Sequence, residues 1–215
     1  MGLLDGLLDR SIFFSFDGSG FRRHSRDFDH RDLDPSMGGK VCIVTGANSG
    51  LGLEVARGLA AGGATVHMLC RNPERGEQAR QAVADEHDTS GVHLHVVDLS
   101  SQSSIRRFAE RFEASRVDVL VHNAGLLPLE REITKEGLEL TVATHLVGPF
   151  LLTQLLRNKL HGARVIFVSS GGMYGKRLDV DTMMANDGPY DGVAAYAMTK
   201  RGQVVISEML AEELA

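Results

Sequence analysis

The sequence predicts an α/β domain built on a doubly wound parallel sheet. Short apolar, β-branched segments alternate with longer segments whose apolar residues recur at helical spacing. A chain of 215 residues, 43% of them hydrophobic, is long enough to bury a core of domain size. Strands that alternate with helices form a parallel sheet with both faces covered, because each crossover lays a helix on one face.

Five segments are predicted to form the strands of this sheet. They are residues 41–44, residues 64–69, a third strand that ends just before Asp98, residues 117–122 and residues 164–168. Helices are expected directly after the first strand, over about 134–160 and over about 194–215.

The first predicted strand runs directly into a glycine-rich turn, and a helix follows. Glycines permit a tight turn and a close backbone approach to a diphosphate, and a helix N-terminus offers unpaired N–H groups. We therefore expect a phosphate site rather than a plain connection. The residues expected to form it are Thr45, Gly46, Asn48, Ser49, Gly50, Leu51 and Gly52.

Tyr196 and Lys200 lie four residues apart on the last predicted helix, so they share one face. The ammonium favours the phenolate form of the tyrosine, and the pair can act as a proton donor near neutral pH. The spacing alone is weak evidence. It gains weight because the glycine-rich turn lies upstream.

The spacing Gly46-x-x-x-Gly50-x-Gly52 and four later motifs resemble the short-chain dehydrogenase/reductase family, whose fold is Rossmann-type. The later motifs are Asp98-Leu99, Asn123-Ala124-Gly125, Ser169-Ser170 and Tyr196 with Lys200, in the family's order. The resemblance covers residues 38–215. Within the family, the Ser-Ser-Gly-Gly-Met stretch and the N-terminal leader resemble the member-twelve-like dehydrogenases/reductases.

This resemblance implies hydride transfer between a nicotinamide cofactor and a carbonyl or alcohol. Tyr196 would move the proton, Lys200 would assist it and bond the nicotinamide ribose, and Ser170 would hydrogen-bond the reacting oxygen. Ser169 stays open as an alternative, because neighbouring strand residues point to opposite sides. The resemblance also implies that Asp98, Leu99, Asn123, Ala124 and Gly125 contact the cofactor.

The end of the second strand favours NADP over NAD. Cys70 stands where NAD-preferring enzymes commonly hold an acidic residue, and Arg71 follows it. A guanidinium can hold a ribose phosphate through forked, charge-assisted bonds, whereas a carboxylate would repel it. A solvated arginine at a strand end is the alternative.

His145 stands where the family usually has an asparagine that holds a water linking the lysine to solvent. Histidine can bridge a water too, and it titrates near neutral pH. A role in the proton relay and a satisfied helix histidine both remain open.

A second departure is that the sequence stops at Ala215, inside the last predicted helix, whereas family members continue with two further strands. We expect a C-terminally incomplete domain, a fragment rather than a short form. The alternative function is a catalytically weak or inactive nucleotide-binding protein that acts through association.

Residues 1–37 differ from the rest and are predicted to form an N-terminal arm, with the truncated nucleotide-binding domain over 38–215. Leucines at 3, 4, 7 and 8 form an apolar stripe typical of a short amphipathic helix. We expect the arm to pack on its own domain or on a partner subunit.

Composition limits the kinds of partner and the location expected for this chain. A net charge of −5 gives no reason to expect nucleic acid, and no apolar run approaches the ~20 residues that span a membrane. Cys42 and Cys70 are expected to be reduced core thiols, which makes the cytoplasm the default location. His93 and His95 lack metal-binding companions, so no metal is expected.

The expected substrate is a small carbonyl or alcohol. The loop between Ser170 and Tyr196 resembles that of retinol-dehydrogenase-like members, which suggests a bulky or apolar compound. The two long helices suggest a homodimer or homotetramer.

Overall fold

The computed structural model describes residues 8–9, 18–29, 31, 36–185 and 187–214. The chain divides into two compact units, Met1–Ser36 and Met37–Ala215. The first contains helix α3 (Gly18–His24) and a 3₁₀ turn (Ser25–Asp27), and Asp9 pairs there with Arg23 and His24. Of the leucine stripe predicted at positions 3, 4, 7 and 8, the first three positions lie outside the described residues.

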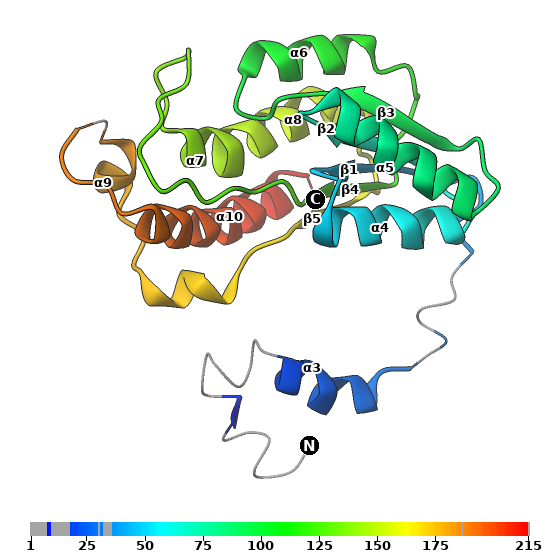
Figure 1. Cartoon of the computed structure of the whole chain (residues 1–215), viewed down its shortest axis with the longest axis horizontal. Helices are drawn as coiled ribbons and strands as arrows, with labels where there is room; N and C mark the ends of the chain where they lie inside the picture. Colours follow the sequence, from blue (N-terminus) through cyan, green and yellow to red (C-terminus); the bar gives the residue numbers. More distant parts are fainter. Residues whose placement is uncertain (1–7, 10–17, 30, 32–35, 186, 215) are drawn as a thin grey trace. The chain divides into compact units, whose positions relative to one another are not determined.

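The second unit is built on a parallel sheet of five strands in the order β3-β2-β1-β4-β5 (Figure 1). The strands are β1 (Val41–Thr45), β2 (Thr65–Cys70), β3 (Val92–Val96), β4 (Val119–His122) and β5 (Arg164–Phe167). The strand order reverses between β1 and β4, which opens a crevice at the carboxyl ends of these two strands. The predicted doubly wound parallel sheet is confirmed.

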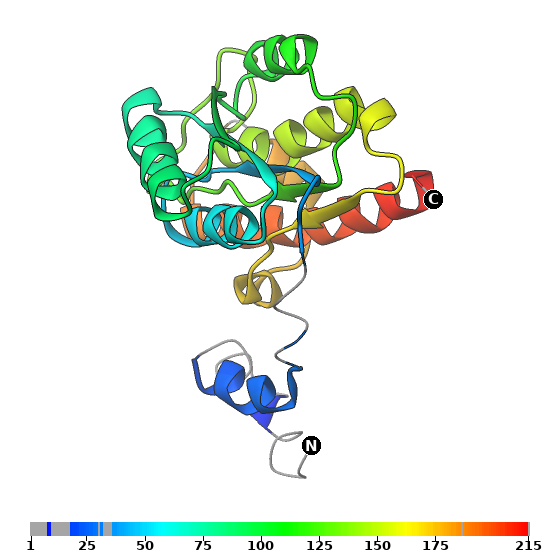
Figure 2. The same ribbon diagram turned by 90° about the vertical axis from the view of Figure 1, so that its right-hand side faces the viewer.

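Alternation along the strands divides the apolar residues between two cores. Cys42 and Val44 of β1 face one core, whereas Ile43 between them faces the other. Helices α4 (Gly50–Ala61) and α5 (Pro73–Glu86) cover the first face. Helices α6 (Gln102–Arg111) and α8 (Gly148–Leu156) cover the second (Figure 2).

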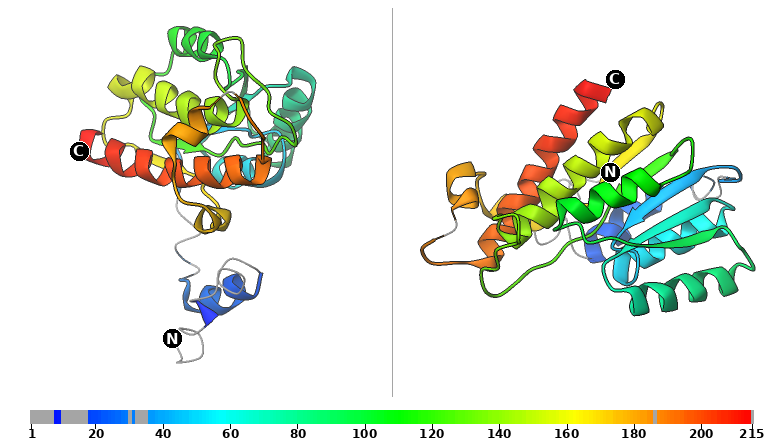
Figure 3. Two further views of the ribbon diagram at one scale, coloured as in Figure 1. Left: turned by 90° about the vertical axis from the view of Figure 1, so that its left-hand side faces the viewer. Right: turned by 90° about the horizontal axis from the view of Figure 1, so that it is seen from above.

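Helix α10 (Gly192–Leu214) lies beside α8, as Figure 3 shows from above. Leu210 of this helix lines a hollow with Val165 and Phe167 of β5. The segment between β5 and α10 contains a 3₁₀ helix, η5 (Gly171–Gly175), and the short helix α9 (Val180–Met184).

The helix predicted from about residue 134 begins later than expected. Gly137 has φ +79° in a turn closed by its N–H on the Thr134 carbonyl, so residues 134–139 are not helical. The Glu139 carboxylate accepts the Val142 N–H at 2.9 Å and caps the new helix. The elements that follow are α7 (Leu140–Val142), a π-helical turn η3 (Ala143–Val147), α8 and a 3₁₀ turn η4 (Arg157–Lys159).

Several histidines and both cysteines lie at or near the sheet. Cys42 and Cys70 are free and buried, as expected, and burial raises the pKa of both thiols to about 11. His67 stacks on His93 and lies 2.9 Å from His95, Nδ1 to Nε2. Within the described residues, no group of histidine, cysteine, aspartate or glutamate side chains is arranged as a metal site. No helix in this part of the chain is both long enough and apolar enough to cross a bilayer.

Gly148 tests how tightly α8 packs, and the exposed Gly58 of α4 is the control. A Cβ on Gly148 would lie 2.3 Å from the Leu99 carbonyl oxygen, whereas a Cβ on the exposed Gly58 of α4 would meet nothing within 4 Å. We expect Gly148→Ala to lower the free energy of unfolding by about 1–3 kcal/mol. Gly58→Ala should raise it by about 0.5–1 kcal/mol, because it only reduces the freedom of the unfolded chain. Urea unfolding measures both, and equal effects would contradict the packing described.

Candidate active site

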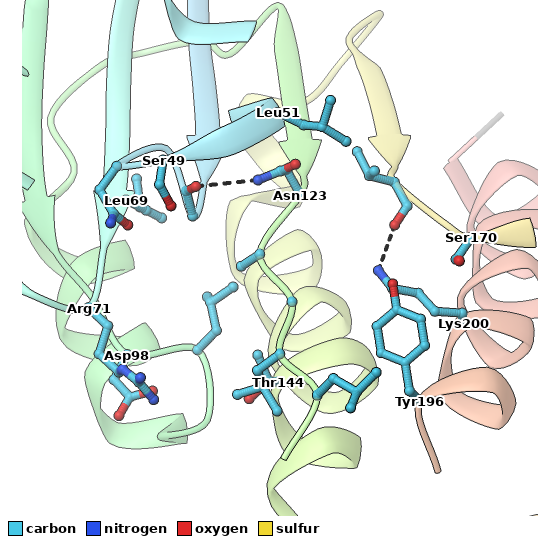
Figure 4. A pocket seen from close by; sticks show the side chains of 18 of the residues that line it. Ser49, Leu51, Leu69, Arg71, Asp98, Asn123, Thr144, Ser170, Tyr196 and Lys200 are labelled. Carbon is cyan, nitrogen blue, oxygen red and sulfur yellow. Dashed lines mark hydrogen bonds between the residues drawn. The ribbon is translucent and has the colours of Figure 1, made fainter. Parts of the chain in front are cut away.

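A cavity of about 670 Å³ lies along the carboxyl ends of the strands (Figure 4). Most residues predicted for the cofactor and catalysis line it. These are Gly46, Asn48, Ser49, Leu51, Arg71, Asp98, Leu99, Asn123, Ala124, Gly125, Ser170, Tyr196 and Lys200.

Four predicted residues do not line the cavity: Thr45, Gly50, Gly52 and His145. Seven others do line it, of which the sequence raised Ser169 only as an alternative. They are Leu69, Val97, Leu126, Leu127, Thr144, Val168 and Ser169. The remaining six were not predicted. Leu69, Val97 and Val168 lie at strand ends, Leu126 and Leu127 follow Gly125, and Thr144 lies in the π-helical turn.

The glycines of the turn serve different purposes. Gly46 and Gly50 have φ +65° and +55°, a left-handed backbone conformation that residues with a side chain rarely adopt. Gly52 has ordinary φ but no space, because a Cβ would lie 2.4 Å from Asn123 Nδ2 and 2.5 Å from the Gly46 carbonyl oxygen. Of the three, Gly46 lines the cavity and brings backbone without a side chain to its wall.

Thr45 and Asn123 hold this turn against β4. The Thr45 hydroxyl accepts the backbone N–H groups of Asn123 and Ala124 at 3.0 and 3.1 Å. The Asn123 amide in turn donates to the carbonyls of Thr45 and Gly46 at 3.0 and 3.3 Å. Thr45 is fully buried, so it shapes the turn from behind.

The N-terminus of α4 lies at the same cavity, since Ser49 and Leu51 line it. Ser49 is the N-cap residue, is exposed, and makes no side-chain capping bond. The first-turn N–H groups and the positive end of the helix dipole are thus available to an anion.

At the end of β2 the side chains of Cys70 and Arg71 point different ways. Cys70 is 1% exposed in the core, whereas Arg71 is exposed and lines the cavity with Asp98 (Figure 4). The Asp98 carboxylate accepts the backbone N–H and the hydroxyl of Ser100 at 2.9 and 2.7 Å. The guanidinium of Arg71 thus lies directly after β2, exposed at the cavity wall.

Tyr196 and Lys200 lie at the other end of the cavity and project from one face of α10, as their spacing predicts (Figure 4). Lys200 is 3% exposed, and its Nζ lies 5.6 Å from the centre of the Tyr196 ring. The ammonium donates to the Val168 carbonyl at 2.7 Å and to Gln203 Oε1 at 3.0 Å. Burial lowers the pKa of Lys200 to about 8.

The two serines after β5 differ in their hydrogen bonds. The Ser169 hydroxyl donates to the Lys200 carbonyl at 2.8 Å, so it ties the strand end to α10. The Ser170 hydroxyl accepts the Gly172 N–H at 3.2 Å, which leaves its own proton available to the cavity.

His145 is fully buried, and both ring nitrogens have partners. Nε2 accepts the Leu126 N–H at 3.0 Å, so the proton of the neutral ring is on Nδ1, 2.9 Å from the Thr199 hydroxyl. Burial, and secondarily the Lys200 charge, lower the pKa of His145 to about 3. Both ring nitrogens are engaged within the protein, which supports the interpretation of a satisfied helix histidine, and the lowered pKa argues against a change of charge near neutral pH.

We expect His145 to stay neutral in the folded protein between pH 5 and 8, because a second proton would face the Leu126 N–H. Long-range ¹H–¹⁵N spectra should show one unchanging tautomer, whereas the urea-unfolded chain should titrate near 6.5. Since the folded pKa lies below the unfolded one, the stabilisation is complete above about pH 6.5 and is lost as the pH falls toward 3. Titration of the folded ring above pH 5 would contradict the assignment.

Comparisons with known proteins identify the family of this chain. The short chain dehydrogenase family model matches residues 40–215. Dehydrogenase/reductase SDR family member 12 of Bos taurus is 40% identical over 194 residues, which cover 88% of this chain and 61% of the relative. Retinol dehydrogenase 13 of Homo sapiens is 35% identical over 82% of this chain and 55% of its own length. The chain thus spans little more than half of these relatives.

Solved structures share the fold. A protein from Mycobacterium Paratuberculosis is 34% identical with a TM-score of 0.76, over 84% of this chain and 64% of that one. A short chain dehydrogenase from Escherichia coli CFT073, complexed with NADPH, is 25% identical with a TM-score of 0.67, over 84% and 73%. The family model covers most of the chain, including the glycine turn, Tyr196 and Lys200. The chain belongs to the short-chain dehydrogenase family.

Proposed function

We propose that this chain binds NADP(H) and reduces a carbonyl or oxidises an alcohol, with Tyr196 as the acid/base. The observation that carries the proposal is one cavity that has a bare glycine turn and Arg71 at one end and Ser170, Tyr196 and Lys200 at the other. A bound nicotinamide cofactor would supply or accept the hydride. The E. coli relative complexed with NADPH supports a nicotinamide cofactor.

The residues at the Tyr196 end have complementary roles in this proposal. During reduction Tyr196 gives its phenolic proton to the carbonyl oxygen, and during oxidation it takes the alcohol proton. Lys200 stabilises the phenolate, and its remaining N–H would bond the nicotinamide ribose of a bound cofactor. Ser170, whose hydroxyl proton is available, donates to the reacting oxygen and stabilises its developing charge.

The preference for NADP rests on Arg71. Cys70 is buried and no carboxylate takes its place at the end of β2, while the Arg71 side chain is exposed on the cavity wall. A guanidinium there suits a ribose phosphate.

The chain also offers apolar surface for a substrate and for a second copy. Leu126, Leu127 and Val168 line the cavity, which favours a bulky or apolar substrate. Apolar side chains of α8 and α10 are exposed and support self-association through these helices. They are Phe150, Leu155, Val205 and Met209.

Tyr196→Phe should strongly slow turnover and retain cofactor binding, because it removes only the phenolic hydroxyl that carries the transferable proton. We expect a loss of about 10²–10⁴-fold in the rate of NADPH consumption with a panel of aldehydes and ketones. NADPH fluorescence measures binding in the same samples. Tyr174→Phe is the control, since Tyr174 is 51% exposed on η5. Unchanged turnover in Tyr196→Phe would remove Tyr196 as the acid/base. Nucleotide binding without turnover in the unchanged chain would favour the alternative, a nucleotide-binding protein that acts through association.

Arg71→Ala should weaken NADPH far more than NADH, because only NADPH carries the ribose phosphate. A lost charge-assisted contact predicts about a 10–100-fold rise in the Kd for NADPH. Arg75→Ala is the matched control, an exposed arginine on α5 that does not line the cavity. Equal losses for the two nucleotides in Arg71→Ala would remove the phosphate role.

A further inference from the structure

Gln203 is a fully buried polar side chain one turn after Lys200 on α10, and the proposed chemistry gives it no role. Its Oε1 accepts from the Lys200 ammonium at 3.0 Å, and its Nε2 donates to the His145 carbonyl at 3.0 Å. An ammonium only donates and a carbonyl only accepts, so the amide is held in one orientation.

The His145 carbonyl is available to Gln203 because of the local helix geometry. In an α-helix this carbonyl would accept the N–H of residue 149, but Pro149 has none. The chain forms the π-helical turn η3 here, in which the Gly148 N–H bonds to the Ala143 carbonyl. Gln203 Nε2 therefore donates to a carbonyl for which Pro149 offers no N–H.

Lys200 in turn depends on few acceptors. Two of its three ammonium hydrogens go to the Val168 carbonyl and to Gln203, and the third remains for the cavity that Lys200 lines. The ionisable groups that face it are His145 of η3, which is neutral, and Tyr196 of its own helix. Burial disfavours the charged form of Lys200, so the loss of either acceptor would destabilise the ammonium.

We propose that Gln203 is a positioning residue that keeps the Lys200 ammonium charged and directs its free hydrogen toward the cavity. Gln203 acts through Lys200, and through the His145 carbonyl it fixes α10 to the π-helical turn. Its importance for catalysis rests on the proposed function, in which that charge assists Tyr196.

The test is the titration of Lys200 itself, followed by the ¹³C shift of the lysine ε-carbons in the full 215-residue chain. The chain has five lysines, and the Lys200 signal is the one missing from Lys200→Met. Gln203→Met keeps the length of the side chain but offers only a weak acceptor. We expect its Lys200 midpoint to fall by about one pH unit or more, as for a lost hydrogen bond to a charged group.

Gln203→Glu is the rescue variant, because it keeps an oxygen toward Lys200. Its midpoint should stay at or above that of the unchanged chain. Should Gln203→Met fail to fold, this variant decides the matter alone, since a lower midpoint in Gln203→Glu overturns the proposal.

Leu210→Ala is the control for packing, because Leu210 is 3% exposed on the same helix and lies outside the cavity. It should lower the stability and leave the Lys200 midpoint unchanged. If Gln203→Met behaves in the same way, Gln203 is a packing residue and the proposal fails. The readout needs neither cofactor nor substrate, so this failure is distinct from a failure of the proposed function, which Tyr196→Phe judges.

Discussion

The buried ammonium of Lys200 constrains the elements around it, because a cation removed from water needs acceptors at fixed positions. Val168, just after β5, supplies one of them, and Gln203 on α10 supplies the other. Ser169 donates to the carbonyl of Lys200 and adds a second tie between the strand end and the helix. The end of β5, the π-helical turn and α10 are thus held around one charge, and this arrangement sets where Tyr196 lies.

The opposite end of the cavity depends on backbone rather than on charge. Gly52 leaves room for the Asn123 amide and the Gly46 carbonyl. The Thr45 hydroxyl accepts the Asn123 N–H and so ties the end of β4 to the turn. This close approach exposes the N-terminus of α4 to the cavity. Because parallel strands end at one edge of the sheet, Arg71 after β2 and Asp98 after β3 reach the same wall.

Much of this site could be predicted from the sequence, since its residues follow strand ends and carry distinctive spacing. Arg71 and the glycine turn are local features of this kind. The role of His145 could not be predicted, because its ring meets Leu126 and Thr199, which are 19 and 54 residues away in the chain. The start of the helix near residue 140 was also missed, since Gly137 and the Glu139 cap outweigh the apolar pattern.

The order of strands and helices along the chain, the glycine-rich turn after the first strand and the shared face of Tyr196 and Lys200 follow from the sequence alone. Each of these depends on contacts within a few residues or on the alternation of apolar side chains. The serine that is tied to α10, the tautomer of His145 and the acceptors of the Lys200 hydrogens are set by the fold. Those outcomes depend on donors and acceptors that folding brings together from distant segments, and burial makes each pairing obligatory.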